Sequence, residues 1–408
     1  MRFFFYSHDG VGLGHVRRNL AVAGALTKAL PGAKILVATS VDEVCRLGLP
    51  ANVDTLKIPG LRKVSNAEYG ARRLGLASGE IHALRSALLL GAVRSFRPDV
   101  VVVDKHPLGA GGEMCAALEA ARAMGARAAL GLRDILDDPA DVRREWGQRD
   151  LAKRITDYYD AVLVYGSPEI FDPVREYRLP EVVARRAHYC GYVLNHFDCA
   201  WRSNECLNEC PYLLVLDAKR HPIVLGTAGG GEDGYKVISA FVRAAGTEPW
   251  NSVAVAGPMI SAAELKSLQR QAAARRVTMH TFIPCLSNLF GTADALVCMG
   301  GYNTLIEAAA QALPTVCVPR TEPRTEQLIR AQAFERLGLL RVVRPETLTP
   351  ARLRRAVKGA LQTSRSELSA RVRAALHFDG AKRAAHHLMV LATPVRRATS
   401  RRAARAAG

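Results

Sequence analysis

Short apolar runs alternate with longer stretches in which apolar residues recur at helical spacing. In the first half of the chain, the apolar runs have the length and composition of strands buried in a parallel sheet. These runs lie at 2–7, 34–39, 53–58, 99–103, 128–131 and 161–165. Helical patterns separate them at 16–30, 41–48, 78–96, 113–124 and 140–157. The alternation predicts βαβ crossovers and a doubly wound sheet, in which ligands bind at the carboxyl ends of the strands.

A second series of the same kind begins after residue 220. Strand patterns lie at 222–226, 252–256, 277–282, 295–299 and 315–318. Helical patterns lie at 235–245, 262–273, 286–292, 303–312, 325–337, 349–361, 366–376 and 379–391. The fold class predicted for the whole chain is therefore α/β, with two Rossmann-like domains.

The length of 408 residues agrees with two domains, because it exceeds what one ordinary core holds. The boundary falls in a stretch with irregularly spaced cysteines, which fits a linker better than a zinc site. We expect a first domain at 1–191, a linker at 192–220, a second domain at 221–376, a C-terminal helix at 377–393 and a basic disordered tail at 394–408. The tail is expected to be disordered because it has almost no large apolar residue to bury.

Composition favours a cytoplasmic protein. The chain is 49% hydrophobic and 23% charged, has no apolar run long enough to span a membrane, and opens directly on a strand pattern. Nine cysteines without regular pairing indicate reduced thiols rather than a disulfide framework.

The net charge of +18 is concentrated near the C-terminus. Residues 341–408 contain 16 Lys and Arg against three acidic residues. Such a region would suit peripheral contact with an anionic membrane at the inner face, or a phosphorylated acceptor. The alternative is a compositional bias toward Ala and Arg on solvated helix faces. Aromatic residues are scarce there, which argues against binding of single-stranded nucleic acid.

The most informative motif is Met299-Gly-Gly-Tyr-Asn-Thr-Leu-Ile-Glu307, which reads as the end of a strand, a glycine turn and a helix. Gly300 and Gly301 remove two β-carbons where the helix begins, so backbone N–H groups can approach a phosphate at the positive end of the helix. Glu307 lies within two turns of them, where its carboxylate can accept hydrogen bonds from a ribose.

This motif resembles the donor-nucleotide motif of GT-B glycosyltransferases of the MurG-like group, the family 28 C-terminal type. A second loop, His8-Asp-Gly-Val-Gly-Leu-Gly-His15, is similar to the glycine loop that opens the acceptor-side domain of that family. Gly131-Leu-Arg-Asp-Ile135 and the glycine run at 229–231 are similar to a group of bacterial predicted glycosyltransferases. The resemblance implies a GT-B fold, with two Rossmann-like domains facing across a cleft, and a hexosyltransferase activity.

The same resemblance implies a set of donor-binding residues. They are Gly229 and Gly230, Phe282 and Ile283, Gly300, Gly301, Asn303, Thr304 and Glu307, and Arg320, Arg324, Glu326 and Gln327. Either arginine would neutralise the leaving diphosphate. Phe282 is expected to pack in the core rather than against the base. The alternative for the segment at 320–327 is that Glu326 caps a helix and that the two arginines are exposed to solvent.

His15 is the leading candidate for the base that deprotonates the acceptor, with His8 and Asp9 as substitutes. The alternative for His15 is a capping or core histidine. By the resemblance of their loop, Gly12 and Gly14 are acceptor-side candidates. Asp104, Lys105, His106, Arg133 and Asp134 are further candidates, because polar residues at the ends of parallel strands usually belong to a site. Lys105 and Arg133 would suit a phosphate or carboxylate.

No Asp-x-Asp motif occurs in the chain. By the resemblance, the site would work without a metal or other cofactor. The expected function is transfer of a sugar from a nucleotide-sugar donor, UDP-linked by the MurG-like pattern, to an unidentified acceptor. The alternatives are a nucleotide-sugar 2-epimerase of the same fold and a nucleotide-binding protein without catalysis. The loop at 11–15 departs from the usual epimerase loop.

Overall fold

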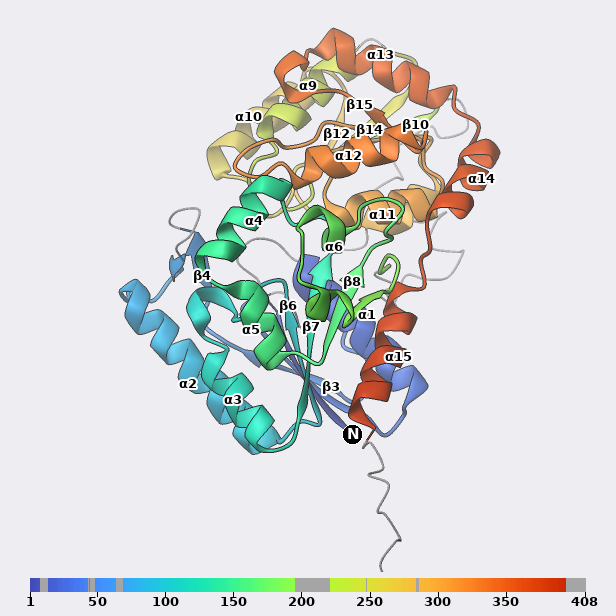
Figure 1. Ribbon diagram of the computed structural model, residues 1–408. Coiled ribbons are helices and arrows are strands. Elements are labelled where there is room, and N and C mark those ends of the chain that lie inside the picture. Colours follow the sequence, from blue (N-terminus) through green and yellow to red (C-terminus); the bar gives the residue numbers. More distant parts are fainter. Residues whose placement is uncertain are drawn as a thin grey trace, which may run out of the picture.

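The chain forms two α/β domains in the computed structural model, one above the other in Figure 1. The structure describes residues 1–7, 14–42, 44, 48–63, 69–194, 221–246, 248–283 and 286–393. Each domain is built on one parallel sheet covered by helices on both faces. The prediction of two doubly wound α/β domains is therefore confirmed.

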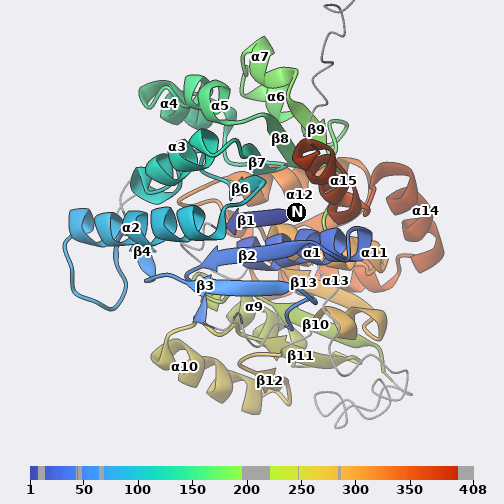
Figure 2. The same cartoon turned by 90° about the horizontal axis from the view of Figure 1, so that it is seen from below.

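The sheet of the N-terminal domain has the strand order β3-β2-β1-β6-β7-β8-β9, with every pairing parallel. Figure 2 shows these strands side by side. Their bounds are β1 Arg2–Tyr6, β2 Lys34–Thr39, β3 Val53–Lys57, β6 Val100–Asp104, β7 Arg127–Arg133, β8 Ala161–Tyr165 and β9 Ala187–Tyr189. A short antiparallel hairpin, β4 Leu61–Lys63 with β5 Tyr69–Ala71, stands apart from the sheet.

Alternating side chains of β1 pack on opposite faces of this sheet. Phe3 and Phe5 pack in one apolar cluster with residues of the helices Gly14–Ala29 and Gly380–Ala392. Phe4 and Tyr6 pack in another with residues of the helices Ser78–Phe96 and Cys115–Ala123. Both faces are covered, which explains why the strand reads as a continuous apolar run. The helices are α1 Gly14–Ala29, α2 Ser78–Phe96, α3 Cys115–Ala123, α4 Pro139–Gln148, α5 Leu151–Tyr158, α6 Pro173–Glu176, α7 Glu181–Ala184 and the 3-10 helix η2 Ala110–Gly112.

The sheet of the C-terminal domain repeats the pattern, with the order β12-β11-β10-β13-β14-β15. Its strands are β10 Ile223–Thr227, β11 Asn251–Val255, β12 Thr278–His280, β13 Ala295–Cys298, β14 Thr315–Cys317 and β15 Arg341–Val342. Its helices are α9 Tyr235–Ala245, α10 Ala262–Ala273, α11 Tyr302–Ala310, α12 Glu326–Arg336, α13 Pro350–Leu361, α14 Arg365–Ala375 and the 3-10 helices η3 Leu286–Gly291 and η4 Pro345–Thr347.

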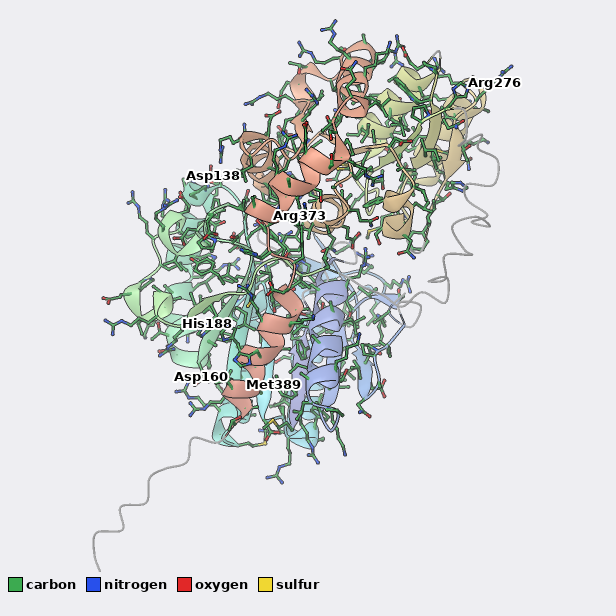
Figure 3. The ribbon with its side chains drawn as sticks, turned by 90° about the vertical axis from the view of Figure 1, so that its right-hand side faces the viewer. Asp138, Asp160, His188, Arg276, Arg373 and Met389 are labelled. Atoms are coloured by element: carbon green, nitrogen blue, oxygen red, sulfur yellow. The ribbon has the colours of Figure 1, made fainter. Side chains whose placement is uncertain are left out.

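The chain returns to the N-terminal domain through its last helix, α15 Gly380–Ala392. This helix lies beside α1 (Figure 3), and the rings of His188 and His387 stack with centroids 4.2 Å apart. The returning segment runs against residues 191–193, because Tyr192 N–H donates to the carbonyl of His377 and Gly380 N–H donates to that of Tyr192. The segment that leaves the N-terminal domain, at 191–193, and the segment that returns to it, at 377–380, are thus joined by backbone hydrogen bonds.

Several elements differ from the sequence-based expectation. The helix expected at 140–157 is two helices, broken where Asp150 adopts a left-handed backbone with φ of 49°. The segment at 286–292 is a 3-10 helix, the strand expected at 277–282 is shorter, and the short strands β4, β5, β9 and β15 were not expected. Half of the residues expected to form a helix at 41–48 lie outside the described residues. Within the described part, no helix is both long and apolar enough to cross a membrane.

Candidate functional site

The two sheets direct the carboxyl ends of their central strands toward the boundary between the domains. In each sheet the strand order reverses beside the first strand, between β1 and β6 and between β10 and β13. Loops diverge at such a switch point and leave a crevice. Asp104 ends β6, Thr227 ends β10, and the glycine motif follows β13. The predicted residues of both domains therefore gather at one boundary.

His15, Asp104 and Arg18 form a buried cluster at the carboxyl end of β6. Nδ1 of His15 is hydrogen-bonded to Oδ2 of Asp104. Nη2 of Arg18 donates to both oxygens of Asp104, at 2.7 and 3.0 Å. The three residues are at most 8% exposed. Asp104 thus orients the imidazole with its Nδ1–H toward the carboxylate, which leaves the basic lone pair on Nε2.

This cluster sets the charge of His15. Burial lowers the pKa of His15 to about 4, although the negative charge of Asp104 opposes the shift. Burial raises the pKa of Asp104, but Arg18 and His15 hold it well below its usual range. The imidazole is therefore neutral near pH 7, which is the state that a general base requires.

The glycine motif begins α11 and has the backbone expected of a tight turn. Gly300 has φ of 75°, and a Cβ there would lie 3.1 Å from Sγ of Cys317 and 3.2 Å from the carbonyl oxygen of Gln327. Gly301 is the N-cap residue of α11, and a Cβ there would meet nothing within 4 Å. The positive end of this helix is therefore open, as a phosphate seat requires.

The start of α1 meets the start of α11 across the domain boundary. A Cβ on Gly14 would lie 3.2 Å from Nδ2 of Asn303. Arg17 Nη2 donates to Oε1 of Glu307 at 3.0 Å, and Glu307 is 8% exposed. The glycine loop beside His15 and the donor motif are thus adjacent. A ribose at Glu307 would share this carboxylate with Arg17. Thr304 is partly buried on the same helix.

The loop after β10 is tied to the start of α12 by Arg320. Gly229, with φ of 64°, and Gly230 follow Thr227, whose hydroxyl oxygen accepts from Gly229 N–H at 3.2 Å. Arg320 donates to Asp233 of this loop at 2.9 Å and to Oε1 of Glu326 at 2.6 Å.

Glu326 and Gln327 are both engaged by Arg320. The side-chain oxygen of Gln327 accepts from Arg320 N–H at 3.1 Å. Glu326 is 3% exposed, and its Oε2 is buried without a hydrogen-bond partner. A buried carboxylate oxygen of this kind requires a donor, such as a hydroxyl.

Asp134 and Arg324 have partners in the opposite domain. Asp134 is fully buried, and Arg330 of α12 donates to both of its oxygens at 2.7 and 2.9 Å. Asp134 therefore joins the domains, and its predicted place on the acceptor side stays a prediction. Arg324 lies 3.6 Å from Asp137 and 3.6 Å from Glu145, both in the N-terminal domain. The pairing of Arg324 with acids differs from the expected contact with a leaving diphosphate.

The same interface contains a stacked arrangement that the sequence did not indicate. The ring of Tyr302 lies 5.6 Å from the guanidinium of Arg18 and 5.7 Å from that of Arg330. Arg330 Nη1 also donates to the carbonyl of Gly300 at 3.2 Å. Cation–π contacts of Tyr302 with Arg18 and Arg330 therefore connect the His15 cluster with the glycine motif.

Lys105, His106 and Arg133 lie at the carboxyl ends of the adjacent strands β6 and β7. Lys105 has a left-handed backbone, with φ of 72°, and its N–H donates to the carbonyl of Gly131 at 2.8 Å. Burial and the charge of Arg133 lower the pKa of Lys105 to about 7. Burial also lowers the pKa of His106 well below its usual value.

Some predicted residues lie elsewhere. Phe282 is 42% exposed and does not pack in the core, whereas Ile283 is 4% exposed. His8, Asp9 and Gly12 lie outside the described residues, as do 195–220 and the tail at 394–408. Arg18, Arg330 and Tyr302 were missed. Only Arg18 had a signal in the sequence, because it follows His15 by one helical turn.

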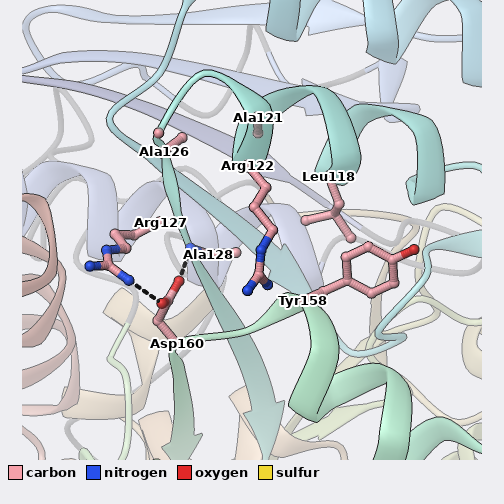
Figure 4. Close-up of a pocket in the computed structure, with 9 residues that line it drawn as sticks. Leu118, Ala121, Arg122, Ala126, Arg127, Ala128, Tyr158 and Asp160 are labelled. Atoms are coloured by element: carbon pink, nitrogen blue, oxygen red, sulfur yellow. Dashed lines mark hydrogen bonds and ion pairs between the residues drawn. The ribbon is translucent and has the colours of Figure 1, made fainter.

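A separate pocket of about 230 Å³ lies at the opposite edge of the N-terminal sheet (Figure 4). Leu118, Arg122, Arg127 and Asp160 are among its lining residues. Arg127 pairs with Asp160 at 2.7 Å, and Arg122 donates to the carbonyl of Asp157. The pocket is at the amino ends of β7 and β8, away from the edge where doubly wound sheets bind ligands.

Comparison with known proteins agrees with this geometry. Residues 247–388 match the glycosyltransferase family 28 C-terminal domain. No curated protein matches the sequence. MurG of Acinetobacter baumannii is similar in structure at 14% identity and a TM-score of 0.61, over 95% of this chain and 99% of that one.

Two further solved structures resemble the chain over nearly its whole length. The glycosyltransferase VinC in complex with dTDP gives 20% identity and a TM-score of 0.62, over 96% of this chain and 99% of that one. A UDP-glucose: anthocyanidin 3-O-glucosyltransferase in complex with UDP gives 12% identity and a TM-score of 0.64, over 96% of this chain and 98% of that one. The chain thus has the GT-B fold, and residues 247–388 are similar to the C-terminal domain of glycosyltransferase family 28.

Proposed function

We propose that this protein transfers a sugar from a nucleotide-sugar donor to an acceptor held by its N-terminal domain. The observation that carries the proposal is the meeting of His15 and its carboxylate partner with the open start of α11 at one domain boundary. Sugar transfer needs a base beside a diphosphate seat, and this boundary offers both. The family 28 domain supports the same activity.

In the proposed mechanism, the start of α11 at Gly301 holds the diphosphate, and Glu307 accepts a hydrogen bond from the ribose. Nε2 of His15 takes the proton from the acceptor hydroxyl as its oxygen attacks the anomeric carbon. The bond from that carbon to the diphosphate breaks, and the negative charge of the leaving diphosphate is stabilised by the helix N-terminus. The unpartnered Oε2 of Glu326 would accept from a hydroxyl of the donor sugar.

The donor base is proposed to be uracil, on the MurG-like pattern of the glycine motif. VinC is described with dTDP, and the anthocyanidin glucosyltransferase with UDP. Both are pyrimidine nucleotides. The site is proposed to work without a metal, which predicts that EDTA leaves turnover unchanged.

Thermal-shift measurement against UDP, dTDP and GDP tests donor binding, because a ligand of the native state raises the melting temperature by mass action. The proposal predicts a clear shift with UDP and a smaller one with GDP. If none of the three shifts the melting temperature, the proposal fails. With the responding nucleotide sugar, His15→Ala should lower turnover about 100-fold or more and leave nucleotide affinity nearly intact. Unchanged turnover would remove His15 from the role of base.

We further propose peripheral contact of the basic C-terminal region with an anionic membrane. Exposed Arg352, Arg355, Arg371 and Arg373 lie on α13 and α14. Attraction of this kind weakens with salt. Deletion of 394–408 should reduce sedimentation with anionic vesicles. Unchanged sedimentation would contradict a contribution of residues 394–408 to membrane binding.

A further inference from the structure

Almost every cation at the domain boundary has a carboxylate partner. Arg18 pairs with Asp104, Arg330 with Asp134, Arg17 with Glu307 and Arg320 with Glu326 and Asp233. Arg324 lies within 4 Å of Asp137 and Glu145. Pairing of this kind is the rule for charges removed from water.

Lys105 and Arg133 are the exceptions among the described residues. Neither side chain has a hydrogen bond or an ion pair, and Nε of Arg133 is buried. Each is only partly exposed. Two cationic side chains therefore lie in a confined place without a direct carboxylate partner, although the charge of Glu326 acts on both of them.

These two side chains come from one edge of the sheet. Lys105 follows β6 and Arg133 ends β7, and the two strands are paired as far as Asp104 and Gly131. The electrostatic interaction of Lys105 with Arg133, Arg324, Glu326 and Asp104 shows that the start of α12 faces it from the other domain. The two cations therefore lie beside the Asp104 that orients His15, with no direct ion pair to it.

The backbone of Lys105 is left-handed, a conformation that Arg97, Arg178 and Arg276 also adopt. Its φ of 72° is a left-handed conformation that a lysine adopts only at a cost in free energy. Strain of this kind is concentrated at ligand-binding sites. A glycine or asparagine at residue 105 would relieve it.

We propose that Lys105 and Arg133 form a subsite for a phosphate group of the acceptor. Two unpaired cations match a doubly charged group better than a single carboxylate. The guanidinium supplies a forked pair of donors and the ammonium a point charge. The inference rests on the proposed glycosyl transfer, because the subsite adjoins His15 rather than the start of α11. It narrows the acceptor to phosphorylated molecules.

The occupancy of this subsite should depend on pH. The pKa of Lys105 is lowered to about 7, first by burial and then by Arg133 and Arg324, against Glu326 and Asp104. The nearby imidazoles of His15 and His106 have pKa values lowered by burial, so both are neutral near pH 7. An anion prefers the protonated amine, so it binds most tightly below pH 7 and more weakly as the pH rises through that value.

Sulfate is the probe, because it is a tetrahedral dianion whose charge does not change between pH 6 and 8.5. Its dissociation constant is measured on the full chain at constant ionic strength. We expect Lys105→Met and Arg133→Met each to weaken binding about 10-fold or more. Lys382→Met, at an exposed lysine of α15, is the matched control and should change nothing. Equal sulfate affinity in wild type and in both variants would overturn the subsite.

Two further measurements separate the subsite from folding and from the donor. Lys105→Gly should raise the melting temperature and still lose sulfate affinity; a variant that keeps its affinity would overturn the role of the amine. With saturating UDP, sulfate should bind as before. Displacement of sulfate by UDP, with weaker UDP binding in Lys105→Met, would assign the two cations to the donor diphosphate and overturn the acceptor assignment. Absence of UDP binding would refute the donor proposal, whereas the sulfate comparison would still be readable.

Discussion

At the scale of single residues, the state of His15 is fixed by two neighbours that have opposite charges. Asp104 accepts from Nδ1 of the imidazole and also accepts from Arg18. Arg18 neutralises the carboxylate that would otherwise stabilise an imidazolium. The burial of the three groups then favours the uncharged imidazole.

This arrangement predicts the titration of His15. With its pKa lowered to about 4 by burial, His15 should stay neutral from pH 8 down to about pH 5. NMR of protein labelled at histidine would follow the ring signal, and His15→Gln would assign it. A midpoint near the ordinary value of 6.5 would contradict the account. Because the native imidazole binds a proton less readily than the unfolded one, this group contributes stability above pH 6.5 that is lost as the pH falls toward 4.

The sequence identified His15 but not what holds it in place. A histidine after Gly-x-Gly at the start of a helix is a local pattern. Asp104 was expected in the site only because it ends a strand, and its contact with His15 spans 89 positions in the chain. The partner of Asp134 was not predicted for the same reason, because Arg330 is 196 positions away. Residues that pair across such distances along the chain form no local sequence pattern from which the contact could be predicted.

At the scale of elements, α12 is one of the helices through which the C-terminal domain contacts the other one. Asp137 lies at its N-terminus, where Oδ1 accepts from Thr325 N–H at 2.8 Å and from the Thr325 hydroxyl at 3.3 Å. Because Thr325 is the N-cap residue, the acid stands at the positive end of the helix. Arg330 lies one turn further along and binds Asp134. One helix is thus held by two acids of the opposite domain.

Removal of the Asp137 carboxylate should destabilise the first turn of α12. Asp137→Ala should cost about 0.5–2 kcal/mol, as loss of an N-cap acceptor does. Hydrogen exchange should quicken in the first turn of α12 and in residues 133–138. The control is Thr349→Ala, which removes a cap of α13 within one domain, where Thr349 Oγ1 accepts from Arg352 N–H at 3.1 Å. If both variants changed exchange only in their own domain, Asp137 would not hold the interface.

The elements predicted from the sequence are those with long, regular patterns. Strands β2 and β8 and helices α2, α9 and α10 have the predicted bounds. The missed strands are short: β4, β5 and β9 have three residues each and β15 has two. Strands of that length carry too few alternating positions to form a pattern, and pairing with a neighbouring strand defines them.

At the scale of the whole molecule, the domains share one apolar cluster. It extends from Phe3 and Leu20 through Tyr192 and Tyr302 to Phe334. Tyr192 contacts Tyr302 and Phe334 with ring centroids 5.9 and 6.2 Å away. The Asp134–Arg330 pair is embedded at this boundary with both side chains fully buried. Separation of the domains would therefore expose both apolar surface and two charges.

Breaking this pair should strongly destabilise the molecule. Arg330→Met leaves Asp134 buried without its partner and should cost about 3–5 kcal/mol of unfolding free energy in urea. Replacing both residues, with Asp134→Leu added, should recover much of the loss, because no unpaired charge remains. A cost below about 1 kcal/mol for Arg330→Met would show that the boundary is open in solution.

The central claim is that the domain boundary at α11 binds a nucleoside diphosphate, and calorimetry with UDP tests it most directly. Glu307→Gln should weaken UDP binding by about 1–3 kcal/mol through the lost ribose contact. Arg17→Gln removes the same ion pair from the other side and should leave UDP affinity unchanged or slightly improved, since Arg17 no longer competes with the ribose for the carboxylate. Equal affinity of wild type and Glu307→Gln for UDP, or equal losses in the two variants, would contradict the account.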